Sequence, residues 1–233
     1  MGKRICRLRQ LWVSEQEKKI KFGLGMKWAD IEADEATFDK QDISKDLKGN
    51  KSKCIMWEQW CGIVQRGRPE TLVLIKLKPK LTHRRAPGPG PIRKLEWTHI
   101  ARKHLQDRKV VFHTDPARAH KLKVPGVVHD RVVHCKKRVK KGKKWVWQTP
   151  KYCQLVRHKL PGGKVLKVKS GTQVIDRCWR FLKERISLNG ATKAGSSMLQ
   201  AKLRSAQYEY WHRCDDLWVH TGKLCAWYAG RIW

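Results

Sequence analysis

The sequence is poor in acidic residues and lacks any long hydrophobic run. Of its 233 residues, 20 are Asp or Glu and 53 are Lys or Arg, which gives a formal net charge of +33. So large an excess favours a polyanionic partner, most simply nucleic acid. The apolar stretches, such as Thr71–Ile75, are as long as a strand and far short of the ~20 residues that span a bilayer. We therefore expect no association with membranes.

Regular cysteine spacing is also missing. The eight cysteines form no C-x-x-C pair, and the first ten residues are too charged for a signal peptide. These absences predict reduced thiols in an intracellular protein, nuclear in a eukaryote and cytoplasmic or nucleoid-associated in a bacterium. The 12 tryptophans and the 40% of hydrophobic residues argue against a disordered basic tail. A chain of this length can bury a full core as one domain, with or without a small appendage.

Apolar periodicity predicts a mixed α/β fold. Strands are expected at 28–38, 56–65, 70–78, 109–114 and 127–134, and helices at 14–20, 92–107, 172–188 and in the tail from 199 to 233. Loops are expected at 39–53 and in the proline-rich stretch 79–92, and a basic insert occupies 136–169. Three antiparallel strands followed by a helical crossover to further strands would form a mixed sheet flanked by helices.

Because acids are scarce, those near the ends of predicted elements stand out. Asp34 lies within the first strand, Asp115 follows the strand 109–114, and Asp176 lies in the first turns of the helix 172–188. A two-metal phosphoryl-transfer site needs carboxylates that converge in this way, and Mg²⁺ or Mn²⁺ prefers such oxygen ligands. Spacing by itself leaves the alternative that each Asp is a solvated surface acid or a helix cap.

Five short segments carry a more specific signal. In chain order they are Ile31-Glu-Ala-Asp-Glu-Ala-Thr-Phe38, Cys61-Gly-Ile-Val-Gln-Arg-Gly67, Val111-Phe-His-Thr-Asp-Pro-Ala-Arg-Ala-His120, His129-Asp-Arg-Val-Val-His134 and Gly171-Thr-Gln-Val-Ile-Asp-Arg-Cys-Trp-Arg-Phe-Leu-Lys183. In this order they resemble motifs of DDE transposases of the Merlin and related bacterial insertion-sequence type. These motifs are V-E-x-D-E-T-x-F, G-x-V-E-R-G, T-D-x-x-x-A-Y, H-x-x-V-N-H and H-T-N-x-I-E-x-x-W-x-x-L-K. Each is short, but together they span residues 28–190.

The resemblance implies an RNase H-like fold, in which the first and fourth strands are adjacent at the centre of the sheet. Residues 28–190 would then be the catalytic domain, between a basic N-terminal segment (1–27) and a tryptophan-rich tail (191–233). Asp34, Asp115 and Asp176 would be the catalytic residues and the ligands of two Mg²⁺ or Mn²⁺ ions. The implied activity is divalent-metal-dependent cleavage and strand transfer of DNA, the chemistry of DNA transposition.

Several departures from the family pattern support a second hypothesis. The third acid is Asp176 where the family usually has Glu, and Gly171, Gln173 and His120 replace its His, Asn and Tyr. No zinc ribbon or helix-turn-helix pattern precedes residue 28, so we expect this chain alone to lack recognition of transposon ends. The alternative is a degenerate, domesticated relative that binds nucleic acid without cleaving it. A basic structural protein such as a ribosomal component would explain the charge but not the five ordered segments.

The basic insert begins with a cluster of cations and two tryptophans. The cluster comprises Lys136, Lys137, Arg138, Lys140, Lys141, Lys143, Lys144, Trp145 and Trp147. One interpretation is a β-ribbon that follows DNA phosphates while the tryptophans stack on unpaired bases. The same cluster would also serve as a nuclear-localisation signal. The alternative is a solvated loop with both tryptophans packed beneath it.

The tail contains two further patterns. His212, Cys214, His220 and Cys225 are zinc-type ligands within 14 residues, but their spacing matches no standard finger. Core cysteines and surface histidines are the alternative. The same part of the chain contains four tryptophans, Trp211, Trp218, Trp227 and Trp233. On one continuous helix, the spacing of seven residues would place the first two on one face. That face would cover the sheet or form a homodimer.

Overall fold

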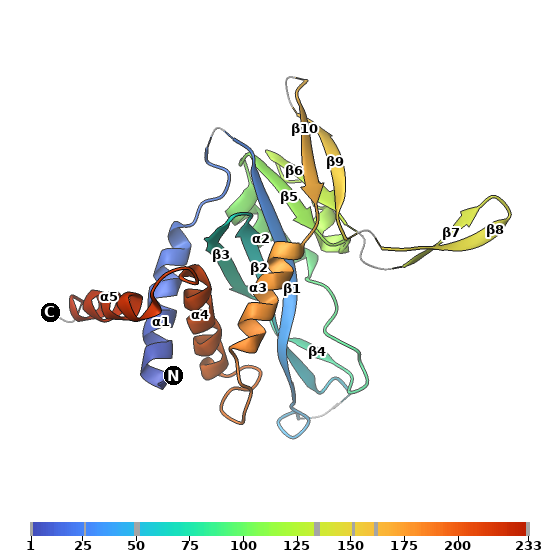
Figure 1. Ribbon diagram of the computed structural model, residues 1–233. Helices are drawn as coiled ribbons and strands as arrows, with labels where there is room; N and C mark the ends of the chain where they lie inside the picture. Colours follow the sequence, from blue (N-terminus) through green and yellow to red (C-terminus); the bar gives the residue numbers. More distant parts are fainter. Residues whose placement is uncertain are drawn as a thin grey trace.

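A six-stranded mixed sheet forms the centre of the chain, with helices on both of its faces (Figure 1). The computed structural model describes residues 2–25, 27–48, 52–132, 136–150, 152–160 and 163–231. The strands of this sheet are β1 (Ala29–Asp42), β2 (Ile55–Gln65), β3 (Arg68–Lys76), β4 (Lys80–Thr82), β5 (Val110–Thr114) and β6 (Val127–Arg131). Their order is β3-β2-β1-β5-β6, and β4 pairs with β2. The expected α/β class with a mixed sheet is therefore confirmed.

The long strand β1 joins an antiparallel half of the sheet to a parallel half. It pairs antiparallel with β2, which pairs antiparallel with β3, whereas β1–β5 and β5–β6 are parallel. The β2–β3 hairpin turns at Gly67, whose φ of +74° lies in the left-handed region that suits glycine. Almost all of β2 is buried, because helices cover both faces of the sheet at this point.

Two hydrophobic clusters lie on opposite faces of the sheet. On one face, helix α2 (Lys94–Leu105) packs Trp97, Ile100 and Leu105 against the odd-numbered residues Ile31 and Ala33 of β1. The other face is covered by α1 (Lys3–Gln16), α3 (Gln173–Glu184) and α4 (Ser197–Trp211). Since α1 and α4 contribute to this second cluster, both ends of the described chain share the core of the sheet.

The helix α1 is longer than the sequence predicts. A helix was expected at 14–20, but it begins at Lys3, and a short 3₁₀ turn, η1 (Glu17–Lys19), follows it. Its buried face consists of Cys6, Arg9 and Val13. Arg9 is buried because it forms an ion pair of 2.6 Å with Glu209 of α4, a partner 200 residues away. A basic residue at a core position hides the amphipathic pattern from sequence reasoning.

Three other boundaries differ from the predictions. β1 continues to Asp42 within the expected loop 39–53, because the start of β2 pairs with residues 40–42. The proline-rich stretch 79–92 includes the short strand β4. The strand predicted at 127–134 ends at Arg131, and residues 133–135 lie outside the described residues. A 3₁₀ turn, η2 (Arg118–Lys121), lies between β5 and β6.

The basic insert forms two antiparallel hairpins. The first is β7 (Lys137–Lys141) with β8 (Lys144–Gln148), and the second is β9 (Gln154–Lys159) with β10 (Val165–Ser170). The hairpin β7–β8 extends away from the body of the protein, whereas β9–β10 stands beside β5 and β6 (Figure 1). The second hairpin leads directly into α3.

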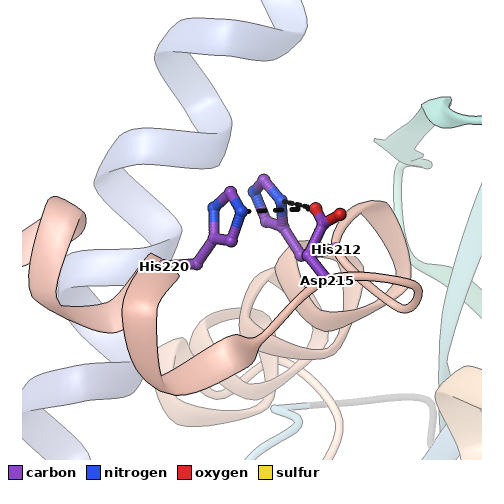
Figure 2. Close-up of side chains that lie close together, drawn as sticks. All are labelled: His212, Asp215 and His220. Carbon is purple, nitrogen blue, oxygen red and sulfur yellow. Dashed lines mark hydrogen bonds and ion pairs between the residues drawn. The ribbon is translucent and has the colours of Figure 1, made fainter.

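The tail forms two helices rather than one. The helix α4 ends at Trp211, and Asp216 caps α5 (Leu217–Ala229) by accepting the N–H groups of residues 218 and 219. At this turn the rings of His212 and His220 stack 3.9 Å apart (Figure 2). The predicted common face is therefore wrong, because Trp211 is buried and Trp218 is 85% exposed. Trp233 lies outside the described residues.

Two expectations concern the whole chain: that it does not associate with membranes and that its thiols are reduced. Among the described helices, none combines the length and apolar character needed to cross a bilayer. The seven cysteines in the described part of the chain are free. Cys135 lies outside it.

Candidate active site

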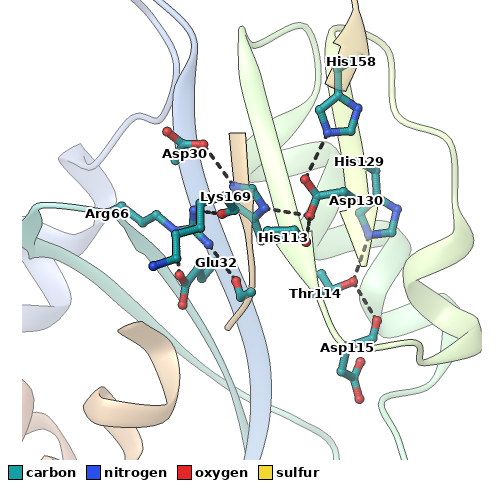
Figure 3. A network of polar contacts seen from close by, with 12 residues as sticks. Asp30, Glu32, Arg66, His113, Thr114, Asp115, His129, Asp130, His158 and Lys169 are labelled. Atoms are coloured by element: carbon teal, nitrogen blue, oxygen red, sulfur yellow. Dashed lines mark hydrogen bonds and ion pairs between the residues drawn. The ribbon is translucent and has the colours of Figure 1, made fainter. Parts of the chain in front are cut away.

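A buried carboxylate on β1 fixes the start of α3. Glu32 is fully buried on the α3 side of the sheet, and its Oε2 accepts the N–H groups of Val174 and Ile175 at 2.7 and 2.9 Å. Its Oε1 accepts Nε of Arg66 at 2.6 Å. Arg66 also donates to the carbonyl oxygens of Lys169 and Gly171 (Figure 3). We call Glu32 and Arg66 the clamp, since they hold the end of β10 and the first turn of α3 on the sheet.

The clamp determines where Asp34 and Asp176 lie. Asp34 follows Glu32 by two residues, so both side chains point to the α3 face of β1. Nε1 of Trp179 in α3 donates to Oδ2 of Asp34 at 3.1 Å. Asp176 lies in the first turn of α3, where Thr172 Oγ1 donates to its Oδ2 at 3.3 Å. The Asp176 residue is exposed, which leaves its carboxylate accessible from solvent.

Asp115 reaches the same region from β5. The parallel pairing of β1 and β5 ends at Glu32 and His113, so Asp115 follows two residues later on the side of Asp34, and its charge acts on Asp34. Its Oδ1 accepts the N–H of Ala117 at 3.1 Å and pairs with His120 Nδ1 at 3.2 Å. The side chain of Asp115 is 36% exposed.

Glu35 lies on the face of β1 opposite to Asp34, and His120 of η2 packs against that face behind Asp115. Both are almost fully buried, and His120 Nε2 lies 3.9 Å from Glu35 Oε2. The backbone N–H of Ile92 donates to the other oxygen of Glu35 at 2.8 Å. Burial raises the pKa of Glu35. His120 thus lies between Asp115 and the buried acid Glu35 on the α2 side, and it is hydrogen-bonded to Asp115.

The three predicted acids interact electrostatically. The pKa of Asp34 rises from 3.8 to about 7, chiefly because of burial, and the negative charges of Glu35, Asp115 and Asp176 contribute to this rise. The structure therefore brings Asp34, Asp115 and Asp176 into one charged region, contributed by β1, the end of β5 and α3. The ligand oxygens of these three carboxylates do not all lie within 4.8 Å of one another. In the described part of the chain, the group of three ligand-type side chains whose ligand atoms lie within 4.8 Å of one another is elsewhere, in the tail.

A glycine creates the space for this arrangement. Gly62 of β2 pairs with Asp34 across the strands. A Cβ at position 62 would lie 2.5 and 2.7 Å from ring atoms of Trp179 and 2.9 Å from Ile175 Cδ1. Because residue 62 has no side chain, the Trp179 ring can pack closely against β2 and reach Asp34.

A second polar network connects the insert to the sheet (Figure 3). His113 of β5 contacts Asp130 Oδ1 through Nδ1 at 2.7 Å and Asp30 Oδ1 through Nε2 at 3.0 Å. Asp130 also accepts Ser170 Oγ at 2.5 Å and His158 Nε2 at 3.0 Å, both from the hairpin β9–β10. Burial would lower the pKa of His113, but the hydrogen bonds to both carboxylates outweigh it and raise the pKa. Asp130 therefore attaches the second hairpin to β5, the strand that ends just before Asp115.

The predicted cation cluster lies on the hairpin β7–β8. All of its residues whose side chains are described are exposed, and the side chain of Lys137 lies outside the described residues. Trp145 and Trp147 are 58% and 64% exposed, so they do not pack beneath a loop. The Arg138 guanidinium lies 5.8 Å from the Trp145 ring centroid. This hairpin offers alternating cations and aromatic faces on an extended arm.

The sequence interpretation missed the clamp, His113 and Asp130, and it treated His120 only as a departure from a motif. Glu32 had one available signal, since it is acidic in an acid-poor chain and lies two residues before Asp34. In the tail, the structure brings His212 and His220 together with Asp215. The predicted ligands Cys214 and Cys225 are exposed and do not belong to this group.

Comparisons of the chain with families of known proteins, with curated proteins and with solved structures found no match.

Proposed function

We propose that the chain is a transposase-like domain of the DDE type, with an RNase H-like fold, that cleaves DNA and transfers DNA strands with the help of divalent metal ions. The observation that carries this proposal is the shared electrostatic region of Asp34, Asp115 and Asp176. Three antiparallel strands followed by two parallel strands, in the order β3-β2-β1-β5-β6, support the fold assignment.

The residues of this region fit Mg²⁺ or Mn²⁺. Asp34, Asp115 and Asp176 supply carboxylate oxygens, which hard divalent cations prefer. The pKa of about 7 means that the ionised form of Asp34 is destabilised in the metal-free chain, by burial and by the neighbouring negative charges. A bound cation would stabilise the ionised form. When bound, two such ions would activate the attacking oxygen and stabilise the leaving oxygen of a phosphodiester.

The chain's own residues would orient the acids and hold the DNA. Trp179 restrains the Asp34 carboxylate, and the N–H of Ala117 together with His120 restrains that of Asp115. The clamp fixes the first turn of α3 and therefore the direction from which Asp176 approaches. The arm β7–β8 would bind DNA phosphates through its cations, and its tryptophans would stack on unpaired bases.

A specific observation favours a second candidate function, a nucleic-acid-binding protein without catalysis. Asp176 is one methylene shorter than Glu and lies at an exposed position, and the ligand oxygens of the three acids do not all lie within 4.8 Å of one another. In that case DNA affinity would depend on salt and not on Mg²⁺.

Nicking of supercoiled plasmid DNA in Mg²⁺ or Mn²⁺ distinguishes these functions. We expect Asp115→Asn to abolish nicking while leaving salt-sensitive binding to a fluorescent oligonucleotide intact. Asp46→Asn, at an acid in the loop after β1, is the matched control and should keep full activity. Nicking by Asp115→Asn at the wild-type rate would refute the catalytic assignment, and metal-independent binding without any nicking would establish the second candidate.

A further inference from the structure

Two histidines and an aspartate meet at the turn between α4 and α5, far along the chain from the acids of the candidate active site. His212 follows the last residue of α4, Asp215 lies in the turn, and His220 is in the first turns of α5 (Figure 2). His212 Nδ1 lies 3.0 Å from Asp215 Oδ2, and His220 Nε2 lies 3.3 Å from the same oxygen. The three ligand atoms lie within 4.8 Å of one another.

The two imidazoles are oriented so that one nitrogen from each faces the same point. Their rings stack with centroids 3.9 Å apart and planes inclined by 30°. Packing holds both residues in this arrangement. The His212 ring contacts the rings of Tyr208 and Trp12, with centroids 4.7 and 5.6 Å away, and Tyr208 Oη donates to the backbone carbonyl of His220 at 2.8 Å.

The two histidines of this cluster are more buried than its aspartate, so a metal ion bound there would be held by the protein on one side and open to water on the other. The side chains of His212 and His220 are 14% and 24% exposed, whereas that of Asp215 is 47% exposed. His212 Nε2 is buried and has no hydrogen-bond partner in the described part of the chain, so its polar contact is made at Nδ1, toward Asp215. The site is therefore preformed on the protein side and open on the solvent side.

We propose that His212, Asp215 and His220 form a binding site for a divalent transition metal, with Zn²⁺ as its occupant. Two imidazoles and one carboxylate are a common zinc ligand set, and an exposed carboxylate leaves room for water in a fourth position. Nitrogen ligands disfavour Mg²⁺ and Ca²⁺. This site is independent of the carboxylates Asp34, Asp115 and Asp176 and of the function proposed for them.

A metal ion here would attach α5 to α4. Only Leu224 of α5 is buried, and Trp218 and Val219 are largely exposed. The helix projects from the body of the protein beside α1 (Figure 1). Coordination by His212 before the turn and His220 after it would fix the angle between the two helices. Metal binding and the ordering of α5 would then be one linked equilibrium.

Zinc binding to the full-length, reduced and metal-stripped chain tests the proposal. In competition with a chromogenic chelator and with excess Mg²⁺ present, we expect one Zn²⁺ to bind per chain. His220→Ala and Asp215→Asn should each weaken binding by roughly 100-fold or more, since even outer partners of metal ligands are worth 10–100-fold. His99→Ala, at an exposed histidine of α2, is the matched control and should bind like the wild type. Asp215 is exposed, so its substitution reports on the ligand set without disturbing the core.

Further measurements separate this site from the other candidate metal ligands of the chain. Asp115→Asn should keep the zinc affinity, and Cys214→Ser and Cys225→Ser should keep it as well. A cobalt(II)-substituted sample should then show the visible bands of a nitrogen and oxygen site without a thiolate charge-transfer band. Hydrogen exchange of α5 amides should slow when Zn²⁺ is added. Unchanged binding in His220→Ala and Asp215→Asn, loss of binding in Cys214→Ser, or no stoichiometric site would each overturn the proposal.

Discussion

Glu32 and Asp34 are carboxylates two residues apart on the same face of one strand, yet their surroundings are opposite. Glu32 is fully buried, and three donors satisfy it: Arg66 and the backbone N–H groups of Val174 and Ile175. Asp34 is less buried, accepts one side-chain hydrogen bond from Trp179, and has three other acids as electrostatic neighbours.

The difference separates a carboxylate that stabilises the fold from one that is available to bind a cation. A buried charge with a full set of hydrogen bonds costs little to keep ionised, because its partners replace the lost water. A buried charge among like charges destabilises the chain until a cation or a proton neutralises it. We therefore expect substitutions at the two positions to change stability in opposite directions.

Glu32→Gln should cause the largest effect. The change leaves Arg66 without its anion and turns an amide N–H₂ toward groups that are themselves donors. Breaking one partner of a buried ion pair costs about 3–5 kcal/mol. We expect the free energy of unfolding, measured by urea denaturation at pH 7, to fall by an amount of this order.

Glu70→Gln is the matched control for this change, because Arg68 and Glu70 form an exposed Arg–Glu pair of 2.8 Å near the same hairpin. Exposed pairs contribute ~0–1 kcal/mol. Equal effects of the two substitutions would contradict the role of the clamp.

Asp34→Asn should stabilise the metal-free chain at alkaline pH. The pKa of Asp34 rises from 3.8 to about 7 on folding, chiefly because of burial. A raised folded-state pKa costs nothing below pH 4, and the cost grows until pH exceeds 7, where it reaches on the order of 4 kcal/mol. The asparagine variant should therefore unfold at a higher temperature than the wild type at pH 8, and at the same temperature at pH 4.

The same variant links stability to the proposed cations. Mg²⁺ or Mn²⁺ should raise the melting temperature of the wild type at pH 8 and raise that of Asp34→Asn much less. A variant that is less stable than the wild type at pH 8 would show that Asp34 is satisfied in the fold, as Glu32 is.

Gly62→Ala should lower the free energy of unfolding by less than Glu32→Gln does. It affects the packing of Trp179 and Ile175, the residues of α3 that contact Asp34 and Glu32. The added methyl group would overlap the ring of Trp179 and the side chain of Ile175, so α3 must shift. Overpacking of this kind costs about 1–3 kcal/mol. Gly88→Ala, where a Cβ meets no atom within 4 Å, is the control for the loss of glycine flexibility. Equal unfolding midpoints for both alanine variants would contradict the close contact at Gly62.

Sequence reasoning located most of the sheet because its strands are short apolar or alternating stretches, several of them bounded by glycine or proline. It singled out the candidate acids because acidic residues are rare in this chain and because the segments around them resemble motifs of a known family. It missed the start of α1, because the buried Arg9 is satisfied by Glu209, which is far away in the sequence. It joined α4 and α5 because a heptad spacing of tryptophans continues across a turn in which no helix exists.

The clamp could not be predicted in the same way. Two of the three donors to Glu32 are backbone N–H groups, which every sequence contains, and they come from a helix some 140 residues later. Only the packed structure shows that this acid is buried and satisfied. The tail site was missed in part for a similar reason, since Asp215 is an ordinary surface acid until the turn brings it between two imidazoles.

A third buried carboxylate, Asp130, extends the comparison with Glu32 and Asp34. Here we expect the smallest change in stability, which is confined to the hairpin β9–β10. Both ring nitrogens of His113 face carboxylate oxygens, which accept hydrogen bonds when ionised, so this environment favours the doubly protonated, positively charged imidazole. A raised folded-state pKa stabilises the chain fully below pH 6.5, and that contribution is lost as pH rises through the folded value. Burial opposes ionisation of Asp130, but its hydrogen bonds to His113, Ser170 and His158 lower its pKa, so its contribution is lost only in acid.

The attachment of β9–β10 should therefore be strongest in mildly acidic solution and weaken toward pH 8. Hydrogen exchange of β9–β10 amides, corrected for the intrinsic pH dependence of exchange, should show less protection at pH 8 than at pH 5.5. The amides of β7–β8 make no contact with this network in the described structure, so their protection should not change. The effect is local, since it opens one hairpin and leaves the sheet folded. Equal protection of β9–β10 at both pH values would mean that His113 keeps its charge through this range, and that Asp130 resembles Glu32 more closely than the pKa directions imply.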